Sequence, residues 1–238
     1  MLAIMKNKIL FYSLLCLGLL GCSKSDPLYL GKQYVGAKYM NDPLGEEIAP
    51  DSDPLIRFDA FDCTTFVETA LANGDRNLLN KIRYKNGEIS FLKRNHFIET
   101  DWIQNNSDIV ENASGKYSKK TAIRTVTIDK QTWFNLIHNI KTKIPLQTID
   151  MEYIPYSDAI NIKTKKTLIV LFIIDNPKII DKIGSDLAVA HMGFLLPNGM
   201  LRHASSQMGR VIDVDFNEYI RDRAKDKTNL GVTLLEIK

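Results

Sequence analysis

The sequence is poor in two residue types that build many catalytic and metal sites. Its 238 residues include only three cysteines and four histidines. Cys16 and Cys22 lie in an apolar N-terminal segment, which leaves Cys63 as the single thiol of the remaining chain. So few cysteines exclude an intramolecular disulfide framework and a structural zinc site of the multi-cysteine kind, and we expect neither a metal nor a cofactor. Cys63 is therefore either a small core residue or a nucleophile.

The sequence also lacks an excess of one charge and a long apolar run at its start. The 31 basic and 28 acidic side chains give a formal net charge of +3, and no basic arm or basic-aromatic patch predicts a nucleic-acid partner. The apolar run at residues 9–20 is shorter than the roughly 20 residues that cross a bilayer as a helix. Because Lys6 and Lys8 precede it, this run is typical of a secretory signal.

The apolar run ends in the letters LLGC at residues 19–22, which resemble the lipobox of bacterial lipoproteins. The resemblance implies that residues 1–21 are a leader that is removed and that Cys22 carries a lipid. The protein would then be exported and held at the cell envelope, and Ser23 favours the outer membrane, facing the periplasm. An ordinary signal peptide and a retained anchor helix are the alternatives. We expect residues 22–238 to form a single domain.

The hydrophobic pattern after residue 62 changes between helical and strand periods. Apolar residues at helical spacing predict helices over residues 63–72, 76–84 and 130–140, and alternating or continuous apolar runs predict strands over residues 121–129, 167–175, 188–196, 200–206 and 231–238. We therefore expect an α+β fold in which the helix that bears Cys63 packs on an antiparallel sheet.

Two of the four histidines lie on either side of a predicted hairpin turn. The letters LPNGM at residues 196–200 are typical of a three-residue hairpin loop that closes with a left-handed glycine. In that register His203 lies opposite Gly193 and His191 opposite Ser205, so the two histidines share one face, about 7–8 Å apart at the backbone. A two-residue Asn-Gly loop would place them on opposite faces.

The position of Cys63 at a helix start favours a chemical role. The free N–H groups and the dipole of a first helical turn stabilise negative charge, so we expect a lowered thiol pKa and a site for an oxyanion. Asp62 either binds an amine of the substrate or caps the helix. His138 lies in the middle of a helical stretch, and we expect it to be structural.

The segments FDCTTFVETAL and AHMGFLLPNGMLRHASSQMGRVI, in this order, resemble the NlpC-type papain-like cysteine peptidases of bacterial cell walls. The resemblance implies a papain-like fold. It also implies that Cys63 is the nucleophile, that His191 is the base, and that His203 orients His191.

Two further segments, YVGAKYMNDPLGE and YKNGEISFLKRNHFIETDWI, resemble the N-acetylmuramoyl-L-alanine amidase-like branch. This implies a cell-wall hydrolase whose partner is peptidoglycan or its muropeptide fragments, cut at the bond between muramic acid and L-Ala. Candidate substrate contacts are Tyr34, Tyr39, Arg94, Asn95 and His96. Core packing is the alternative for the tyrosines, and a surface loop is the alternative for His96.

About 128 residues separate Cys63 from His191, more than a minimal papain-like core needs. We therefore expect an insertion between about residues 75 and 165 that shapes the cleft. Other functions stay open: an endopeptidase that cuts the stem peptide between D-Glu and the diamino acid, a thiol acyltransferase, or a lipoprotein that only binds.

Overall fold

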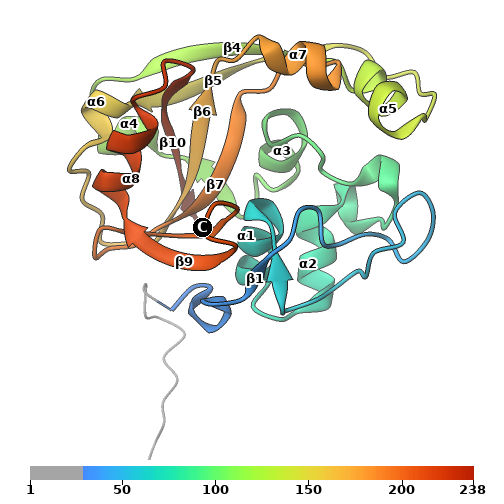
Figure 1. Ribbon diagram of the computed structural model, residues 1–238, viewed down its shortest axis with the longest axis horizontal. Helices are drawn as coiled ribbons and strands as arrows, with labels where there is room; N and C mark the ends of the chain where they lie inside the picture. Colours follow the sequence, from blue (N-terminus) through green and yellow to red (C-terminus); the bar gives the residue numbers. More distant parts are fainter. Residues whose placement is uncertain (1–28) are drawn as a thin grey trace, which may run out of the picture.

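The computed structural model describes residues 29–238 and has a mixed α+β architecture built on one large sheet (Figure 1). The strands are β1 Lys38–Tyr39, β2 Ala60–Phe61, β3 Val110–Asn112, β4 Ala122–Ile128, β5 Gln147–Pro155, β6 Leu168–Ile174, β7 Val189–Leu195, β8 Met200–Ser205, β9 Arg210–Asp215 and β10 Asn229–Ile237. The predicted leader and Cys22 lie outside the described residues.

The sheet runs in the order β2-β1-β9-β8-β7-β6-β10-β5-β4, and β3 also pairs with β10. Neighbouring strands are antiparallel, except that β1 and β2 are parallel. The segment between residues 75 and 165 supplies β3, β4 and β5. Part of the segment expected as an insertion therefore extends the sheet that carries both histidines.

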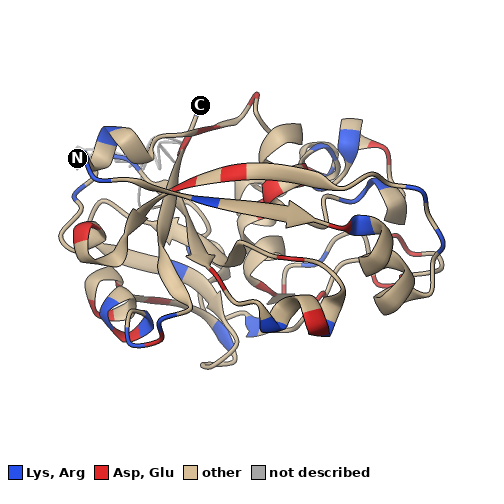
Figure 2. Cartoon of the chain, turned by 90° about the horizontal axis from the view of Figure 1, so that it is seen from above, with Lys and Arg blue, Asp and Glu red and all other residues tan. Residues whose placement is uncertain are grey.

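The α-helices are α1 Cys63–Ala72, α2 Arg76–Arg83, α3 Ile103–Asn105, α4 Ser114–Tyr117, α5 Lys130–His138, α6 Tyr156–Ala159, α7 Lys178–Ile183 and α8 Phe216–Arg223. Short 3₁₀ turns span Lys32–Tyr34, Lys85–Gly87 and Phe91–Lys93, and a π-helical turn spans Ile98–Trp102. Within residues 29–238, none of the helices is both long enough and apolar enough to cross a membrane. Basic and acidic residues are interspersed along the elements, in keeping with their nearly equal numbers (Figure 2).

Strand β6 explains how both faces of the sheet are covered. All seven of its residues are buried, and alternate side chains enter two different cores. Ile169 and Leu171 belong to the core beneath α1, whereas Val170 and Phe172 belong to the core beneath α6 and α8. Because a strand's side chains alternate between faces, a strand covered on both faces is apolar throughout, as the sequence predicted for residues 167–175.

Helix α1 begins and ends where local chemistry dictates. The Asp62 carboxylate accepts a hydrogen bond from the Thr65 N–H at 2.8 Å, and the Thr65 hydroxyl accepts one from the Asp62 N–H at 3.0 Å. This reciprocal cap satisfies two donors that the helix itself cannot pair. At the other end Asn73 adopts φ 47°, a left-handed conformation that stops the helix. The helix predicted over residues 63–72 is confirmed.

The hairpin between β7 and β8 has the predicted three-residue loop. Leu195 pairs with Leu201, the Leu196 N–H donates to the Met200 carbonyl at 2.9 Å, and Gly199 has φ 81°. This register places the two histidines on one face, which confirms the prediction. Gly193 allows the close approach of the strands, because an added Cβ would lie 2.7 Å from the Arg202 carbonyl oxygen.

Candidate active site

Cys63 and His191 are brought together by the packing of α1 against β7. Cys63 is the first residue of α1, partly buried against the core, and its sulfur lies within hydrogen-bonding reach of the Met192 N–H. Met192 directly follows His191 along β7. The thiol therefore lies beside the strand position that carries the expected base.

The two histidines of the hairpin form a direct pair. His191 Nε2 lies 2.8 Å from His203 Nδ1, and the rings are nearly perpendicular, with centroids 4.9 Å apart. One of these nitrogens must carry the shared proton, so the contact fixes complementary tautomers in the two rings. His203 is 3% exposed, and it is therefore screened from solvent while His191 is partly accessible.

The protonation states differ from what the sequence predicts. Burial raises the pKa of the Cys63 thiol to about 12, and the Asp62 charge acts in the same direction. Burial and the nearby Arg223 charge lower the pKa of His203 to about 4; burial, His203 and Arg223 hold the pKa of His191 well below its ordinary value. The prediction that the helix start lowers the thiol pKa is wrong for this resting state, because desolvation outweighs the helix N–H groups. At neutral pH the site holds a thiol and two neutral imidazoles.

Helix α8 forms a wall behind the histidine pair that the sequence reading missed. The ring centroid of Tyr219 lies 5.1 Å from that of His203 and 6.3 Å from that of His191. The Arg223 guanidinium lies 5.3 Å from the ring centroid of Phe172, and its Nε donates to the Tyr156 hydroxyl at 3.3 Å. A capping aspartate at residue 215, followed by apolar residues at helical spacing, was the sequence signal for this helix.

The structure distinguishes between the expected roles of Asp62 and the two N-terminal tyrosines. Asp62 caps α1 and also lines a cavity at the helix start. Burial raises the pKa of Tyr39, and the electrostatic influence of nearby Cys63 and Asp62 acts in the same direction. Tyr34 is 8% exposed, and its ring packs against Phe61 with centroids 5.1 Å apart. Tyr34 is thus a core residue, while Tyr39 lies near the expected cleft.

Arg94 is held by three acids of the irregular loop before α1. Its guanidinium contacts Glu46 at 2.7 Å, Asp51 at 2.6 Å and Asp42 at 3.3 Å. These ion pairs tie the 3₁₀ turn that precedes Arg94 to the loop at residues 41–54. The charge of Arg94 is therefore compensated within the protein, which favours a positioning role over direct capture of an anionic ligand.

Asn95 and His96 are also anchored to the scaffold. The Asn95 amide donates to the Ile82 carbonyl at 2.8 Å, and His96 Nε2 lies 2.7 Å from the Phe91 carbonyl oxygen. The ring of His96 packs 4.8 Å from that of Trp133, and burial lowers its pKa to about 3. Both residues line cavities, but neither contacts the thiol or the hairpin histidines in any interaction found among residues 29–238.

The IETDW segment at residues 98–102 braces the two elements that carry Cys63 and His191. The carboxylate of Glu99 accepts hydrogen bonds from the Ala188 and Val189 N–H groups at 2.7 and 2.6 Å, at the start of β7. Trp102 Nε1 donates to Glu68 at 3.1 Å, and Glu68 belongs to α1. The same turn therefore fixes the strand that bears His191 and the helix that bears Cys63.

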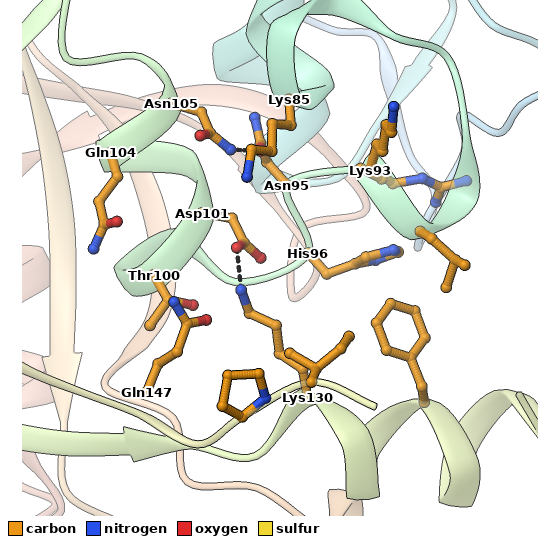
Figure 3. A pocket seen from close by; sticks show the side chains of 15 residues that line it. Lys85, Lys93, Asn95, His96, Thr100, Asp101, Gln104, Asn105, Lys130 and Gln147 are labelled. Carbon is orange, nitrogen blue, oxygen red and sulfur yellow. Dashed lines mark hydrogen bonds and ion pairs between the residues drawn. The ribbon is translucent and has the colours of Figure 1, made fainter. Parts of the chain in front are cut away.

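One cavity lies beside the start of α1, and a second cavity shares three lining residues with it. The helix-start cavity, of about 310 Å³, is lined by Asp62, Thr64 and Thr65 among other residues. The lysine cavity, of about 300 Å³, is drawn in Figure 3 and is lined by polar and basic side chains. Arg94, Asn95 and His96 line both cavities, so the two cavities share a wall. Within residues 29–238, no group of three or more histidine, cysteine and acidic side chains is arranged to hold a metal ion.

Several solved structures have a similar fold. The fold matches that of a Legionella pneumophila protein with a TM-score of 0.80 at 24% identity, covering 89% of this chain and 87% of that one. It also matches an N-acetylmuramoyl-L-alanine amidase from Bacteroides uniformis, with a TM-score of 0.68 at 23% identity, covering 90% of this chain and 98% of that one. At these identities the likeness shows the fold. No curated protein matches the chain.

A match to a protein-family model identifies the family of the chain. Residues 29–228 match the family described as AmiA-like, N-acetylmuramoyl-L-alanine amidase-like. The chain belongs to this amidase-like family, which supports the reading as a cell-wall hydrolase.

Proposed function

We propose that the protein is a cysteine hydrolase that cuts the amide between N-acetylmuramic acid and L-Ala in peptidoglycan. The carrying observation is the thiol at the start of α1 beside a strand whose His191 is hydrogen-bonded to His203. Membership of the amidase-like family supports the substrate class. The resemblance of the cysteine and hairpin segments to NlpC-type papain-like peptidases supports cysteine catalysis on a papain-like scaffold.

The histidine pair determines which nitrogen acts as the base. When His191 Nε2–H donates to His203 Nδ1, the lone pair of His191 lies on Nδ1, which can accept the proton of Cys63. The opposite tautomer would put a proton on His191 Nδ1 and block this transfer. His203 therefore acts as a positioning residue that holds the reactive tautomer of His191.

The reaction begins from the neutral pair. Proton transfer from sulfur to His191 accompanies attack of sulfur on the amide carbon, because the thiol pKa of about 12 keeps free thiolate scarce. The Thr65 N–H is occupied by Asp62, so the N–H groups of Cys63 and Thr64 are the donors available to the oxyanion. His191 then protonates the departing L-Ala nitrogen, and water hydrolyses the thioester with His191 again as base.

Mass spectrometry of reaction products tests this function. The full chain, solubilised in mild detergent, is incubated with peptidoglycan sacculi and with defined muropeptides. We expect free stem peptides that begin with L-Ala, and no product from the Cys63→Ala variant. Fragments that retain L-Ala-D-Glu on the sugar would instead identify an endopeptidase. Full activity of Cys63→Ala would refute the nucleophile, and transfer of the acyl group to an amine would identify an acyltransferase.

The location of the enzyme is a separate proposal that rests on the sequence alone. We propose that the lipid on Cys22 anchors the protein at a membrane facing the cell wall, as LLGC implies. The Cys22→Ala variant is expected to lose lipid labelling and to move from the membrane fraction to the soluble fraction. Unchanged labelling with a fatty-acid probe would contradict the anchor.

A further inference from the structure

The lysine cavity has cations on opposite walls and one carboxylate between them. Figure 3 shows Lys85 entering from the wall beside Asn95 and Asn105, and Lys130 from the facing wall, with Asp101 between the two. Asp101 forms an ion pair with Lys130. The cavity thus brings together residues from the segment after α2, the π-helical turn and the start of α5.

The cations of this wall are not equally compensated. Arg94 is paired with acids of the preceding loop, Lys93 with Glu88, and Lys130 with Asp101. Lys85 has no acidic partner within residues 29–238, and it lines the cavity. Lys85 is therefore the one basic side chain of this cavity that forms no ion pair within residues 29–238.

The rest of the wall offers hydrogen bonds to an anionic or polar ligand. The amides of Gln104, Asn105 and Gln147 line the cavity, and Figure 3 shows them around its rim. A polar group in the cavity would meet the side-chain amides of Gln104 and Gln147 and the ammonium group of Lys85.

We propose that the lysine cavity binds a carboxylate of the stem peptide, through Lys85. The proposal rests on the proposed function. On the sugar side of the bond to be cut, the lactyl carboxyl of muramic acid is already consumed in the amide, so the glycan carries no charge there. The stem peptide, in contrast, carries free carboxylates on its D-Glu, diamino-acid and terminal residues. An anion site in a cavity that shares Arg94, Asn95 and His96 with the helix-start cavity therefore fits the peptide side of the substrate.

The dimensions agree with this direction. Cavities of about 310 and 300 Å³ are each roughly 7 Å across, so together they match about four extended residues at ~3.4 Å per residue. A chain that leaves the thiol along the helix-start cavity passes Arg94, Asn95 and His96 before it reaches Lys85. The stem peptide is thus expected to lie across both cavities, with its first residue near Asp62.

A comparison of charged and uncharged muropeptides tests whether Lys85 binds a carboxylate. The Lys85→Gln variant is compared with wild type on muropeptides whose stem carboxylates are free or converted to carboxamides. We expect Lys85→Gln to raise KM about tenfold at low salt on the free acid, with kcat unchanged and little effect on the carboxamide. Lys119→Gln, at an exposed lysine remote from the cavity, is the matched control and should change neither substrate. Equal losses on both substrates, or no loss on either, would overturn the proposal.

A binding measurement separates this proposal from the proposed function. Calorimetry with the Cys63→Ala variant measures the Kd of both muropeptides without turnover. Weaker binding of the free acid after Lys85→Gln, in the Cys63→Ala background, supports the subsite even if no peptidoglycan amide is cut. If the Lys85→Gln variant cleaves the free-acid muropeptide with the KM and kcat of wild type, the subsite is refuted and the proposed amidase function stands.

Discussion

The protein contains two pairs of neighbouring histidines that differ in how the rings are connected. His191 and His203 share a hydrogen bond of 2.8 Å between ring nitrogens. His96 and His138 also lie near each other, with ring centroids 6.4 Å apart, but His96 is bonded to a backbone carbonyl and both rings pack among aromatic side chains. Burial lowers the pKa of all four imidazoles.

The comparison teaches that a shifted pKa does not identify a catalyst. Desolvation lowers the pKa of a buried histidine whether its ring only packs among other side chains or also transfers a proton. The distinguishing features are the neighbouring nucleophile and a partner that selects one tautomer. Only the hairpin pair has both within the part of the chain that the structure describes.

The largest effect should follow removal of the base. His191→Ala is expected to lower kcat by about 10³-fold or more, because it removes the proposed acceptor of the thiol proton. His138→Ala, the equivalent deletion in the other pair, should change kcat by less than about twofold. Stopped assays of product release measure both. Comparable losses in the two variants would break the distinction between the pairs.

A smaller loss is expected when the positioning residue is changed. His203→Ala should lower kcat by roughly 10²-fold while KM stays near that of wild type, because His191 loses the partner that holds its tautomer. His203→Asn should recover part of the activity, since an amide oxygen can accept the His191 Nε2–H. A purely structural role predicts equal damage by both variants, and thermal unfolding is the control for folding.

The scaffold pair should act on acid stability. The folded-state pKa of His96 is about 3, against an unfolded value near 6.5. As pH falls from 6.5 towards 3 the unfolded state takes up the proton first, so the stability contributed by the neutral ring is progressively lost. His96→Gln should therefore reduce the slope of unfolding free energy between pH 6.5 and 5 by up to about 1.4 kcal/mol per pH unit. Urea titrations over this range measure it, and an unchanged slope would contradict the buried neutral ring.

The smallest effect is expected at His138. Its Nε2 is buried and unpaired within residues 29–238, while its ring packs 4.6 Å from Trp133 and 4.8 Å from Phe91. His138→Phe keeps the ring and removes the unpaired nitrogen, so the free energy of unfolding should change by less than about 0.5 kcal/mol or rise slightly. A large destabilisation would reveal a polar role for this histidine.

Local patterns in the sequence predicted the elements that carry the chemistry. The turn letters LPNGM determine the register of β7 and β8, and Asp62 with Thr65 marks the start of α1, because each signal acts within a few residues. The wall behind the histidines and the two cavities depend on residues far apart in the chain. Arg94 meets Glu46 across 48 positions, for example, and no local pattern reveals that its charge is already paired. The prediction of a lowered thiol pKa was wrong for the same reason, because the burial of Cys63 depends on the whole fold.

The hydrogen bonds from Ala188 and Val189 to Glu99 have a consequence for exchanging parts between relatives. Glu99 in the π-helical turn and Ala188 directly before β7 are 89 residues apart, yet one carboxylate joins the two elements. A chimera that takes the cysteine helix and the hairpin from this protein but the intervening segment from a distant relative would leave two strand amides without their acceptor. The segment between Cys63 and His191 is therefore part of the structure that positions both residues, and we expect a chimera to tolerate its replacement only where the acceptor at position 99 is retained.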